Sequence, residues 1–329
     1  MDGSAPDLVL TKTGCNFCDQ ARKTLWENEF LKPQWNLDLA DLKKQKGKYN
    51  CLIGLSGGAD SSTVLDWAIS EGLKPLCFSV DNGWQHPKAQ ENIMRLVEGP
   101  TPVPYYRYTI NLDRFRSLQA AFLRAGLINQ EIPTDHILYA TTYEMADKYG
   151  IKYILSGGNA ATESIMPYSW SYPARDLTHL KDVYRKMTGK KLKGLPTLGL
   201  LKFNYCRWIK GIKILYPLDF IGYDRAKAIR NLEKYGWQDY GEKHEESVYT
   251  HWYQNFYLFE KYGIDKRKAH YSSLIVSGQM TRKEALFKLQ ACPVYPYLGL
   301  EQKALKYKKR NHEDFKTDKW YDRIANLLR

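Results

Sequence analysis

The sequence lacks any long hydrophobic run, and none of its apolar stretches approaches the roughly 18 residues that a membrane-spanning helix needs. Its N-terminus carries Asp2 and Asp7 and no apolar core, so it has no pattern of a secretory signal. Six cysteines in 329 residues are too few for a disulfide scaffold. These absences predict a cytoplasmic protein with reduced cysteines and no membrane span.

Acidic residues are in deficit. The 49 lysines and arginines exceed the 36 aspartates and glutamates, which gives a formal net charge of +13. Such an excess attracts nucleic acids, nucleotides, nucleotide sugars or an acidic protein, although a solvated basic surface is the simpler interpretation. The positive charge is spread along the chain, is densest at 186–193 and 303–310, and forms no separate basic tail. This pattern disfavours nucleic acid as a partner.

The hydrophobic pattern predicts an α/β fold. Apolar residues make up 43% of the chain, enough for a sizeable core. Short apolar runs predict strands at 49–55, 75–80, 153–155 and 212–216, and 105–110 is a further candidate strand. Helical periodicity predicts helices at 61–70, 113–125, 135–149 and 224–235. Strands that alternate with helices predict a doubly wound parallel sheet.

Changes in hydrophobic periodicity and composition divide the chain into three parts. Residues 1–48 are mixed and poorly periodic. Residues 49–235 form the predicted α/β domain, interrupted at about 160–205 by an insertion rich in aromatics and prolines. Residues 236–329 are expected to be a helical C-terminal region, in which Thr281 and Glu284 form a capping box.

The most informative segment follows the first strand of this domain. Leu-Ser-Gly-Gly-Ala-Asp-Ser-Ser at 55–62 joins a strand to a helix through two glycines, which let backbone N–H groups approach phosphate oxygens. No lysine follows the glycines, so the segment is not a Walker A loop, and it is not the G-x-G-x-x-G pattern of dinucleotide-binding folds. The alternative is an ordinary strand–turn–helix junction.

Ser-Gly-Gly-x-Asp-Ser resembles the loop of the N-type ATP pyrophosphatases, or PP-loop enzymes, whose fold is of the adenine nucleotide alpha hydrolase-like type. The resemblance implies cleavage of ATP between the α- and β-phosphates, transfer of AMP to an acceptor oxygen, and a need for Mg²⁺. It also implies that the loop holds the pyrophosphate and that Asp60 orients the magnesium. The implied loop ligands are Ser56, Gly57, Gly58, Asp60, Ser61 and Ser62.

Two other strand ends carry short polar turns that fit the same site. Val80, Asp81 and Asn82 end the second strand, where adenosine would lie. Gly157, Gly158 and Asn159 end the fourth strand and could meet the α-phosphate or the ribose. Each segment alone is also explained as a simple turn. Together they indicate one crevice at the carboxyl ends of the strands.

The second half of the chain resembles the N-acetyl sugar amidotransferases, PP-loop enzymes of lipopolysaccharide and flagellar sugar synthesis. The motifs that carry this resemblance lie at 204–209 (Asn-Tyr-Cys-Arg-Trp-Ile), 214–219, 236–247, 262–267 and 277–286. The resemblance implies that an acetamido oxygen attacks ATP, that an O-adenylated imidate forms, and that ammonia displaces AMP to leave an acetamidine. The substrate would be an acetamido sugar or a nucleotide sugar. No cysteine here has the setting of a glutaminase nucleophile, so a separate glutaminase subunit is expected to supply ammonia.

Several charged residues of these motifs are candidate site residues. Lys243, His244 and Glu246 match the family's Lys-His-x-Glu-Ser and are candidate catalytic residues, and Lys266 and Arg267 match its Asp-Lys-Arg. Cations suit the phosphates of ATP or the diphosphate of a nucleotide sugar. The alternative is a structural ion-pair network between C-terminal helices.

The chain departs from the family at its start. The family carries two N-terminal Cys-x-x-Cys pairs, whereas only Cys15 and Cys18 form such a pair here. One pair is half of a tetrahedral Zn²⁺ site, which Cys206 or a histidine could complete.

Two other functions are compatible with the loop. A PP-loop enzyme could modify tRNA by thiolation or lysidine formation, which the charge of +13 favours slightly. Thiolation usually needs a reactive cysteine pair near the site, and Cys15 and Cys18 are the sole close pair. A non-catalytic module that binds nucleotide without turnover is the other alternative, and it would release no pyrophosphate.

Overall fold

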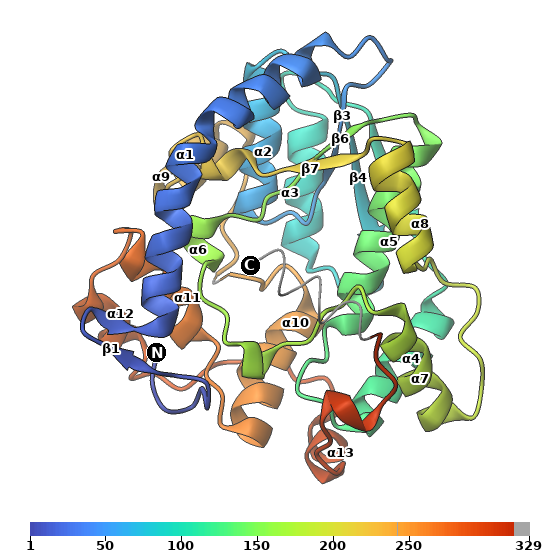
Figure 1. The fold of residues 1–329 in the computed structure, drawn as a ribbon, viewed down its shortest axis with the longest axis vertical. Coiled ribbons are helices and arrows are strands. Elements are labelled where there is room, and N and C mark those ends of the chain that lie inside the picture. Colours follow the sequence, from blue (N-terminus) through green and yellow to red (C-terminus); the bar gives the residue numbers. More distant parts are fainter. Residues whose placement is uncertain (242, 319–329) are drawn as a thin grey trace.

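The computed structural model describes residues 1–241 and 243–318 and contains a five-stranded sheet whose strands are all parallel, in the order β5-β4-β3-β6-β7 (Figure 1). The predicted doubly wound parallel sheet is therefore confirmed, with all five predicted strands in place. The strands are β3 (Cys51–Gly54), β4 (Pro75–Asp81), β5 (Tyr105–Thr109), β6 (Tyr153–Leu155) and β7 (Lys213–Leu215).

Helices cover both faces of the sheet because alternate residues of each central strand point to opposite sides. Cys51 and Ile53 of β3 pack into one cluster with helices α2 (Ala59–Ser70), α3 (Pro87–Val97) and α9 (Arg225–Leu232). Leu52 packs into another cluster with α5 (Ile132–Lys148). Apolar helices on both sides explain why the strands are short, continuous hydrophobic runs.

The strand order reverses between β3 and β6. The chain first moves outward from β3 through β4 to β5, then returns to the other side of β3 to form β6 and β7. At such a switch point the loops after the two central strands diverge and leave a crevice, which is where open parallel sheets bind ligands. The segments that follow β3 and β6 are the Gly-rich loop at 55–58 and the turn at 156–159.

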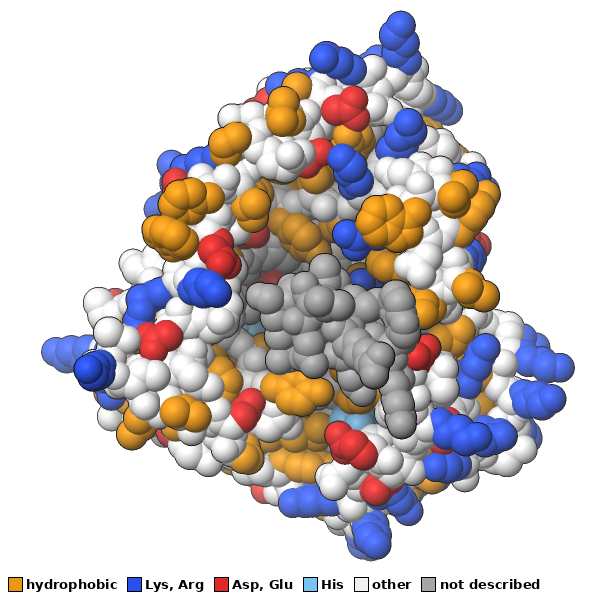
Figure 2. Space-filling model, viewed as in Figure 1, with side chains coloured by type: hydrophobic (Ala, Val, Ile, Leu, Met, Phe, Trp, Pro, Cys, Tyr) orange, Lys and Arg blue, Asp and Glu red, His pale blue; other side chains and the backbone are white. Residues whose placement is uncertain are grey.

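The N-terminal segment contains a long helix that the sequence analysis did not predict. After a small hairpin of β1 (Leu10–Thr11) and β2 (Gly14–Cys15), α1 runs from Asn16 to Lys44 and includes Pro33. Only Ala21, Trp35 and Leu42 of α1 are buried, so no continuous apolar stripe marks the helix. The helix lies along one side of the molecule, contacts α11, and leaves hydrophobic side chains on the surface (Figures 1 and 2).

The remaining elements lie before, between and after those already named. They are α4 (Leu112–Ala125), α6 (Ala160–Glu163), η1 (Tyr168–Trp170), α7 (Leu177–Thr188), α8 (Leu200–Asn204), η2 (Tyr205–Ile209), η3 (Pro217–Asp219), η4 (Glu233–Tyr235), α10 (Val248–Trp252), η5 (Tyr253–Lys261), α11 (Arg267–Val276), α12 (Arg282–Lys288), α13 (Glu301–Lys306) and η6 (His312–Asp314). The predicted capping box of Thr281 and Glu284 is present at the start of α12. Within residues 1–241 and 243–318, no helix has the length and hydropathy that crossing a membrane requires.

The last described segment folds back onto α7 through two buried histidines. His312 Nδ1 lies 3.1 Å from His179 Nε2, and Tyr172 stacks on the ring of His312. Backbone N–H groups of Lys316 and Asp318 donate to carboxylates of the α7 region. Burial lowers the pKa of His179 to about 4 and that of His312 to about 3, so both imidazoles are neutral in the folded protein at neutral pH.

These two histidines predict acid sensitivity. The unfolded chain protonates them near pH 6.5, whereas the folded protein does not, so the unfolded state binds more protons and their contribution to stability is lost as the pH falls from about 6.5 toward 4. We expect each to lower the free energy of unfolding by about 1 kcal/mol per pH unit in that window. Urea unfolding of wild type and His312→Asn at pH 7 and pH 5 checks this; an equal loss of stability in both proteins would contradict it.

Candidate active site

The Gly-rich loop is held in shape by its own serines. Ser61 Oγ accepts a hydrogen bond from the Ser56 N–H at 3.2 Å and lies 3.3 Å from the Gly58 carbonyl oxygen. Ser56 Oγ accepts from the Gly58 N–H at 3.1 Å. Gly58 is the N-cap of α2 and has no side chain to satisfy the first helical N–H groups, so these groups are available to an anion.

Gly57 is required by two independent constraints. Its φ of +86° lies in the left-handed region that side chains disfavour. A Cβ on Gly57 would also lie 2.2 Å from the carbonyl oxygen of Ala89 in α3. The loop therefore passes α3 at a distance that only glycine permits.

The turn after β6 packs directly against the start of α2. A Cβ on Gly157 would lie 2.9 Å from the backbone nitrogen of Ser61. Asn159 caps α6 by accepting from the Thr162 N–H at 2.9 Å, and its Nδ2 group lies 3.4 Å from Asp60 Oδ2. The two segments that the sequence predicts to share a crevice thus contact each other.

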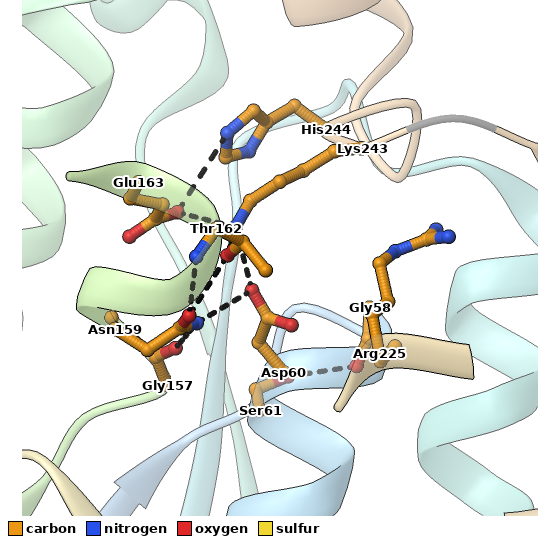
Figure 3. Close-up of polar contacts among 12 residues, drawn as sticks. Gly58, Asp60, Ser61, Gly157, Asn159, Thr162, Glu163, Arg225, Lys243 and His244 are labelled. Atoms are coloured by element: carbon orange, nitrogen blue, oxygen red, sulfur yellow. Dashed lines mark hydrogen bonds and ion pairs between the residues drawn. The ribbon is translucent and has the colours of Figure 1, made fainter. Parts of the chain in front are cut away.

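Lys243 joins this crevice to the C-terminal region. Its Nζ atom lies 2.8 Å from Asp60 Oδ2 and 2.9 Å from Glu163 Oε1, and it also donates to the Thr162 hydroxyl (Figure 3). The other oxygen of Asp60 accepts a hydrogen bond from the Tyr223 hydroxyl. Three distant segments of the chain, at 56–62, 159–163 and 243–247, therefore meet around one ammonium group.

Burial and neighbouring charges together set the protonation of this cluster. Burial alone would lower the pKa of Lys243, but the carboxylates of Asp60 and Glu163 outweigh it and raise the pKa, so Lys243 stays charged. Burial and the cations Lys243, Lys266 and Arg225 hold the pKa of His244 well below its usual value. His244 is therefore a neutral imidazole at physiological pH.

The backbone of His244 has a φ of 70°, the only positive φ of a non-glycine residue within residues 1–241 and 243–318. This conformation costs of order 1 kcal/mol. It sets the ring 3.9 Å from Glu163 and 3.9 Å from Glu246, and against the ring of His270.

Two cavities adjoin at this point. The smaller, of about 200 Å³, is lined by Gly58, Asp60 and Ser61 of the loop and by Glu163, Arg225 and Lys243. The larger, of about 800 Å³, lies over the ends of β4, β6 and β7 and has aromatic walls that include Tyr139, Trp170 and Tyr216. Residues that line both cavities are Gly54, Ser56, Gly157, His244 and Glu246.

Most of the predicted site residues lie at these cavities. The predicted site residues that line one or both cavities are Ser56, Gly58, Asp60, Ser61, Val80, Asn82, Gly157, Lys243, His244, Glu246 and Lys266. Gly57 and Asn159 do not line either cavity but support residues that do. Gly57 allows the loop to pass close to α3, and Asn159 contacts the carboxylate of Asp60. Gly158 follows Gly157 and lines neither cavity.

Three of the predicted ligands face elsewhere. Ser62 is fully buried on the core side of α2 and cannot reach a ligand. Asp81 pairs with Arg107 at 2.8 Å at the edge of the sheet. Arg267 forms a two-point ion pair with Asp265 and donates to the carbonyl of Ala291, which is the structural network that the sequence left open.

The sequence analysis missed several residues of the site. Glu163 follows the Gly-Gly-Asn turn by one helical turn, and Tyr240 lies inside the motif at 236–247. Their positions in the sequence could therefore have marked both as site residues. No sequence pattern marks Arg225 or Tyr223 as a site residue, because their proximity to Asp60 depends on the packing of α9 against α2.

The zinc expectation is not supported. The Sγ atoms of Cys15 and Cys18 lie 3.5 Å apart, but the part of the chain that the structure describes holds no group of three or more His, Cys, Asp or Glu side chains that could bind a metal ion. Cys206 packs in a different cluster, on the sheet.

Comparison with known proteins adds two kinds of similarity. The family model described as "LPS biosynthesis protein WbpG-like, C-terminal domain" matches residues 246–328, about a quarter of the chain. Uncharacterized protein MJ1599 of Methanocaldococcus jannaschii is 26% identical over 133 residues, 39% of this chain and 45% of that protein. GMP synthase [glutamine-hydrolyzing] of Vesicomyosocius okutanii subsp. Calyptogena okutanii is 30% identical over 138 residues, 39% of this chain and 24% of that protein. The match thus spans less than half the length of either relative.

Solved structures give low overall similarity. NMN synthetase from Francisella tularensis matches with 15% identity and a TM-score of 0.30 over 70% of this chain and 90% of that chain. The NH3-dependent NAD synthetase from Campylobacter jejuni in complex with nitrate matches with 12% identity and a TM-score of 0.33 over 85% of this chain and 98% of that chain.

The loop at 56–61 lies at the switch point of a parallel sheet, and the C-terminal region matches the family that its motifs predict. Residues 246–328 are therefore similar to the C-terminal domain of WbpG-like LPS biosynthesis proteins, and the loop at 56–61 resembles that of the PP-loop ATP pyrophosphatases.

Proposed function

We propose that this chain is an ATP-dependent amidotransferase. It adenylates the acetamido oxygen of an N-acetylated sugar, free or on a nucleotide, and replaces that oxygen with ammonia to give an acetamidine, AMP and pyrophosphate. The observation that carries the proposal is the junction of the two cavities. A small polar cavity at the start of α2 opens beside a large one with aromatic walls, and His244 and Glu246 line both.

The small cavity suits the phosphates of ATP. The N-terminal N–H groups of α2, the hydroxyls of Ser56 and Ser61, and the cations Lys243 and Arg225 all face a volume of about 200 Å³. Such donors stabilise the negative charge that grows on the departing pyrophosphate. The large cavity, of about 800 Å³, is within the range of small-molecule sites and offers room for the nucleoside and the acceptor.

Magnesium fits the residues of this cavity. Mg²⁺ in nucleotide sites is usually held by one or two carboxylates together with phosphate oxygens and water. Asp60 and Glu163 are two such carboxylates on one side of the cavity, already close enough to share Lys243. When bound, the ion would neutralise charge on the phosphates.

The acceptor amide loses a proton as its oxygen attacks the α-phosphate. The O–P bond forms, the bond to pyrophosphate breaks, and the amide N–H proton leaves to give a neutral imidate. His244 is held neutral at the rim that the two cavities share, so it is our candidate to accept this proton. Closure of the large cavity would keep water from the imidate.

The cysteines disfavour tRNA thiolation. None of the six cysteines, all of which lie within the described residues, lines either cavity. Burial raises the pKa of Cys51 to about 12, which is typical of an inert core thiol.

The activity itself gives the first prediction. With an acetamido nucleotide sugar, ATP, magnesium and ammonium chloride, we expect a product with the small mass loss of an oxygen replaced by NH, and one AMP and one pyrophosphate per product, measured by mass spectrometry. Glutamine without a partner subunit should not replace ammonium. Formation of ADP, or AMP formation that needs no acetamido sugar, would contradict the proposal.

Asp60 gives a second prediction. Asp60→Asn removes the charge that pairs with Lys243 and that we assign to magnesium, so pyrophosphate release should fall about a hundredfold or more. Asp66→Asn is the matched control, because Asp66 lies on the same helix and pairs with Lys234 and Tyr235 away from the site. Near-normal turnover of Asp60→Asn would remove Asp60 from the mechanism.

Gly57 tests the loop as a phosphate site. Gly57→Ala meets both a positive φ and the carbonyl of Ala89, whereas Gly72→Ala meets only a positive φ of 70° in open space. Gly72→Ala should therefore cost about 1 kcal/mol of stability and leave ATP binding unchanged. Gly57→Ala should displace the loop and abolish ATP binding. Isothermal titration calorimetry measures the ATP affinity of both variants. Equal ATP affinity of the two variants would exclude the loop from the site.

A further inference from the structure

A second charged cluster lies on the wall of the large cavity. Glu131 is the N-cap of α5, and Asp135 lies one turn further along the same helix. Lys266, the N-cap residue of α11, is 9% exposed. All three side chains line the large cavity, and none lines the small one.

This cluster is incompletely satisfied. Glu131 Oε2 accepts a hydrogen bond from the Thr250 hydroxyl at 3.2 Å, but Glu131 Oε1 is buried and has no hydrogen-bond partner within residues 1–241 and 243–318. Lys266 Nζ donates to the thioether sulfur of Met166, a weak acceptor, at 2.8 Å. A buried carboxylate oxygen without a donor is costly, and Glu131 is a residue of the cavity lining, so the two observations together point to a ligand that donates.

The net charge of the cluster is compatible with a small bound cation. Two carboxylates and one ammonium leave one negative charge in a buried place, which either a proton on Glu131 or a bound monocation neutralises. Burial and the charge of Asp135 raise the pKa of Glu131 to about 8, against the opposing charge of Lys266. Tyr249, Tyr253 and Glu246 also face Glu131, and Glu246 belongs to the rim of the small cavity.

We infer that Glu131 binds ammonium in the large cavity and accepts a proton from it, which delivers neutral ammonia to the adenylated acceptor. The inference rests on the proposed function. In this step an N–H bond of ammonium breaks and an O–H bond forms on Glu131 Oε1. Ammonia then forms a C–N bond to the imidate carbon, the C–O bond breaks, AMP leaves with the oxygen, and the released proton stays on the amidine as amidinium.

The position of the cluster suits this order of events. Lys243, His244 and Glu246 line the small cavity, and a few residues later Thr250 donates a hydrogen bond to Glu131. The hydrogen bond from Thr250 thus links Glu131, on the wall of the large cavity, to the segment that follows the rim of the small one. An ordinary exposed carboxylate is too weak a base to deprotonate ammonium, whereas a buried one beside a second carboxylate is a much better match.

The test uses two nucleophiles and one partial reaction. Glu131→Gln keeps an acceptor for Thr250 and removes the base. We expect its ammonium-dependent amidine formation to fall about a hundredfold. Turnover with hydroxylamine, which is uncharged at neutral pH and needs no base, should stay within about twofold of wild type, as should acceptor-dependent exchange of labelled pyrophosphate into ATP. Glu144→Gln, on the same helix but bonded to Tyr108 outside both cavities, should match wild type throughout.

A second variant guards against misfolding. Asp135→Asn removes the charge that raises the pKa of Glu131, so it should reduce the ammonium reaction and spare the hydroxylamine reaction. The inference is overturned if Glu131→Gln leaves the ammonium reaction intact, or if it lowers the exchange or both nucleophile reactions together, since that would assign Glu131 to acceptor binding or structure. No acceptor-dependent exchange in the wild type would instead refute the proposed function, and this inference with it.

Discussion

The ammonium group of Lys243 holds the site together. Its ion pairs with Asp60 and Glu163 are the contacts through which the C-terminal region meets both loops at the switch point of the sheet. The pairs are only partly exposed, and each carboxylate left without Lys243 would be a poorly compensated charge. This interaction therefore couples the position of the C-terminal motifs to the state of the phosphate loop, and Asn159 and Tyr223 fix the direction of Asp60 behind it.

Each cavity carries charges of both signs. Lys243 and Arg225 line the small cavity together with Asp60 and Glu163, at the helix N-terminus where polyphosphate would lie. Glu131 and Asp135 line the large cavity together with Lys266. His244 stands between the two cavities, and its strained backbone and lowered pKa are consistent with a placed neutral base. Burial keeps His244 uncharged and raises the pKa of Glu246 and Glu131. In each case the cause is the same, because burial disfavours the charged form of the side chain.

Local patterns in the sequence predicted the sheet and the loop. Short apolar runs between helical segments specify buried parallel strands, and the two glycines at 57 and 58 specify a close backbone turn, so neither needed tertiary information. Helix α1 was not predicted because its buried residues Ala21, Trp35 and Leu42 are too far apart to form a stripe. The partners of Asp60 could not be predicted from spacing either, since Lys243 lies 183 residues away and Tyr223 lies 163 away. The family motif at 236–247 marked Lys243 as important but not what it touches.

The central claim is that an amide oxygen attacks the α-phosphate of ATP at the junction of the two cavities. It is tested most directly with an acetamido sugar that carries a heavy oxygen isotope in its acetyl group, followed by mass spectrometry of the nucleotide and pyrophosphate released. The account predicts one heavy oxygen in each AMP formed and none in pyrophosphate. Unlabelled AMP would contradict it, because the acceptor oxygen would then never have bonded to phosphorus.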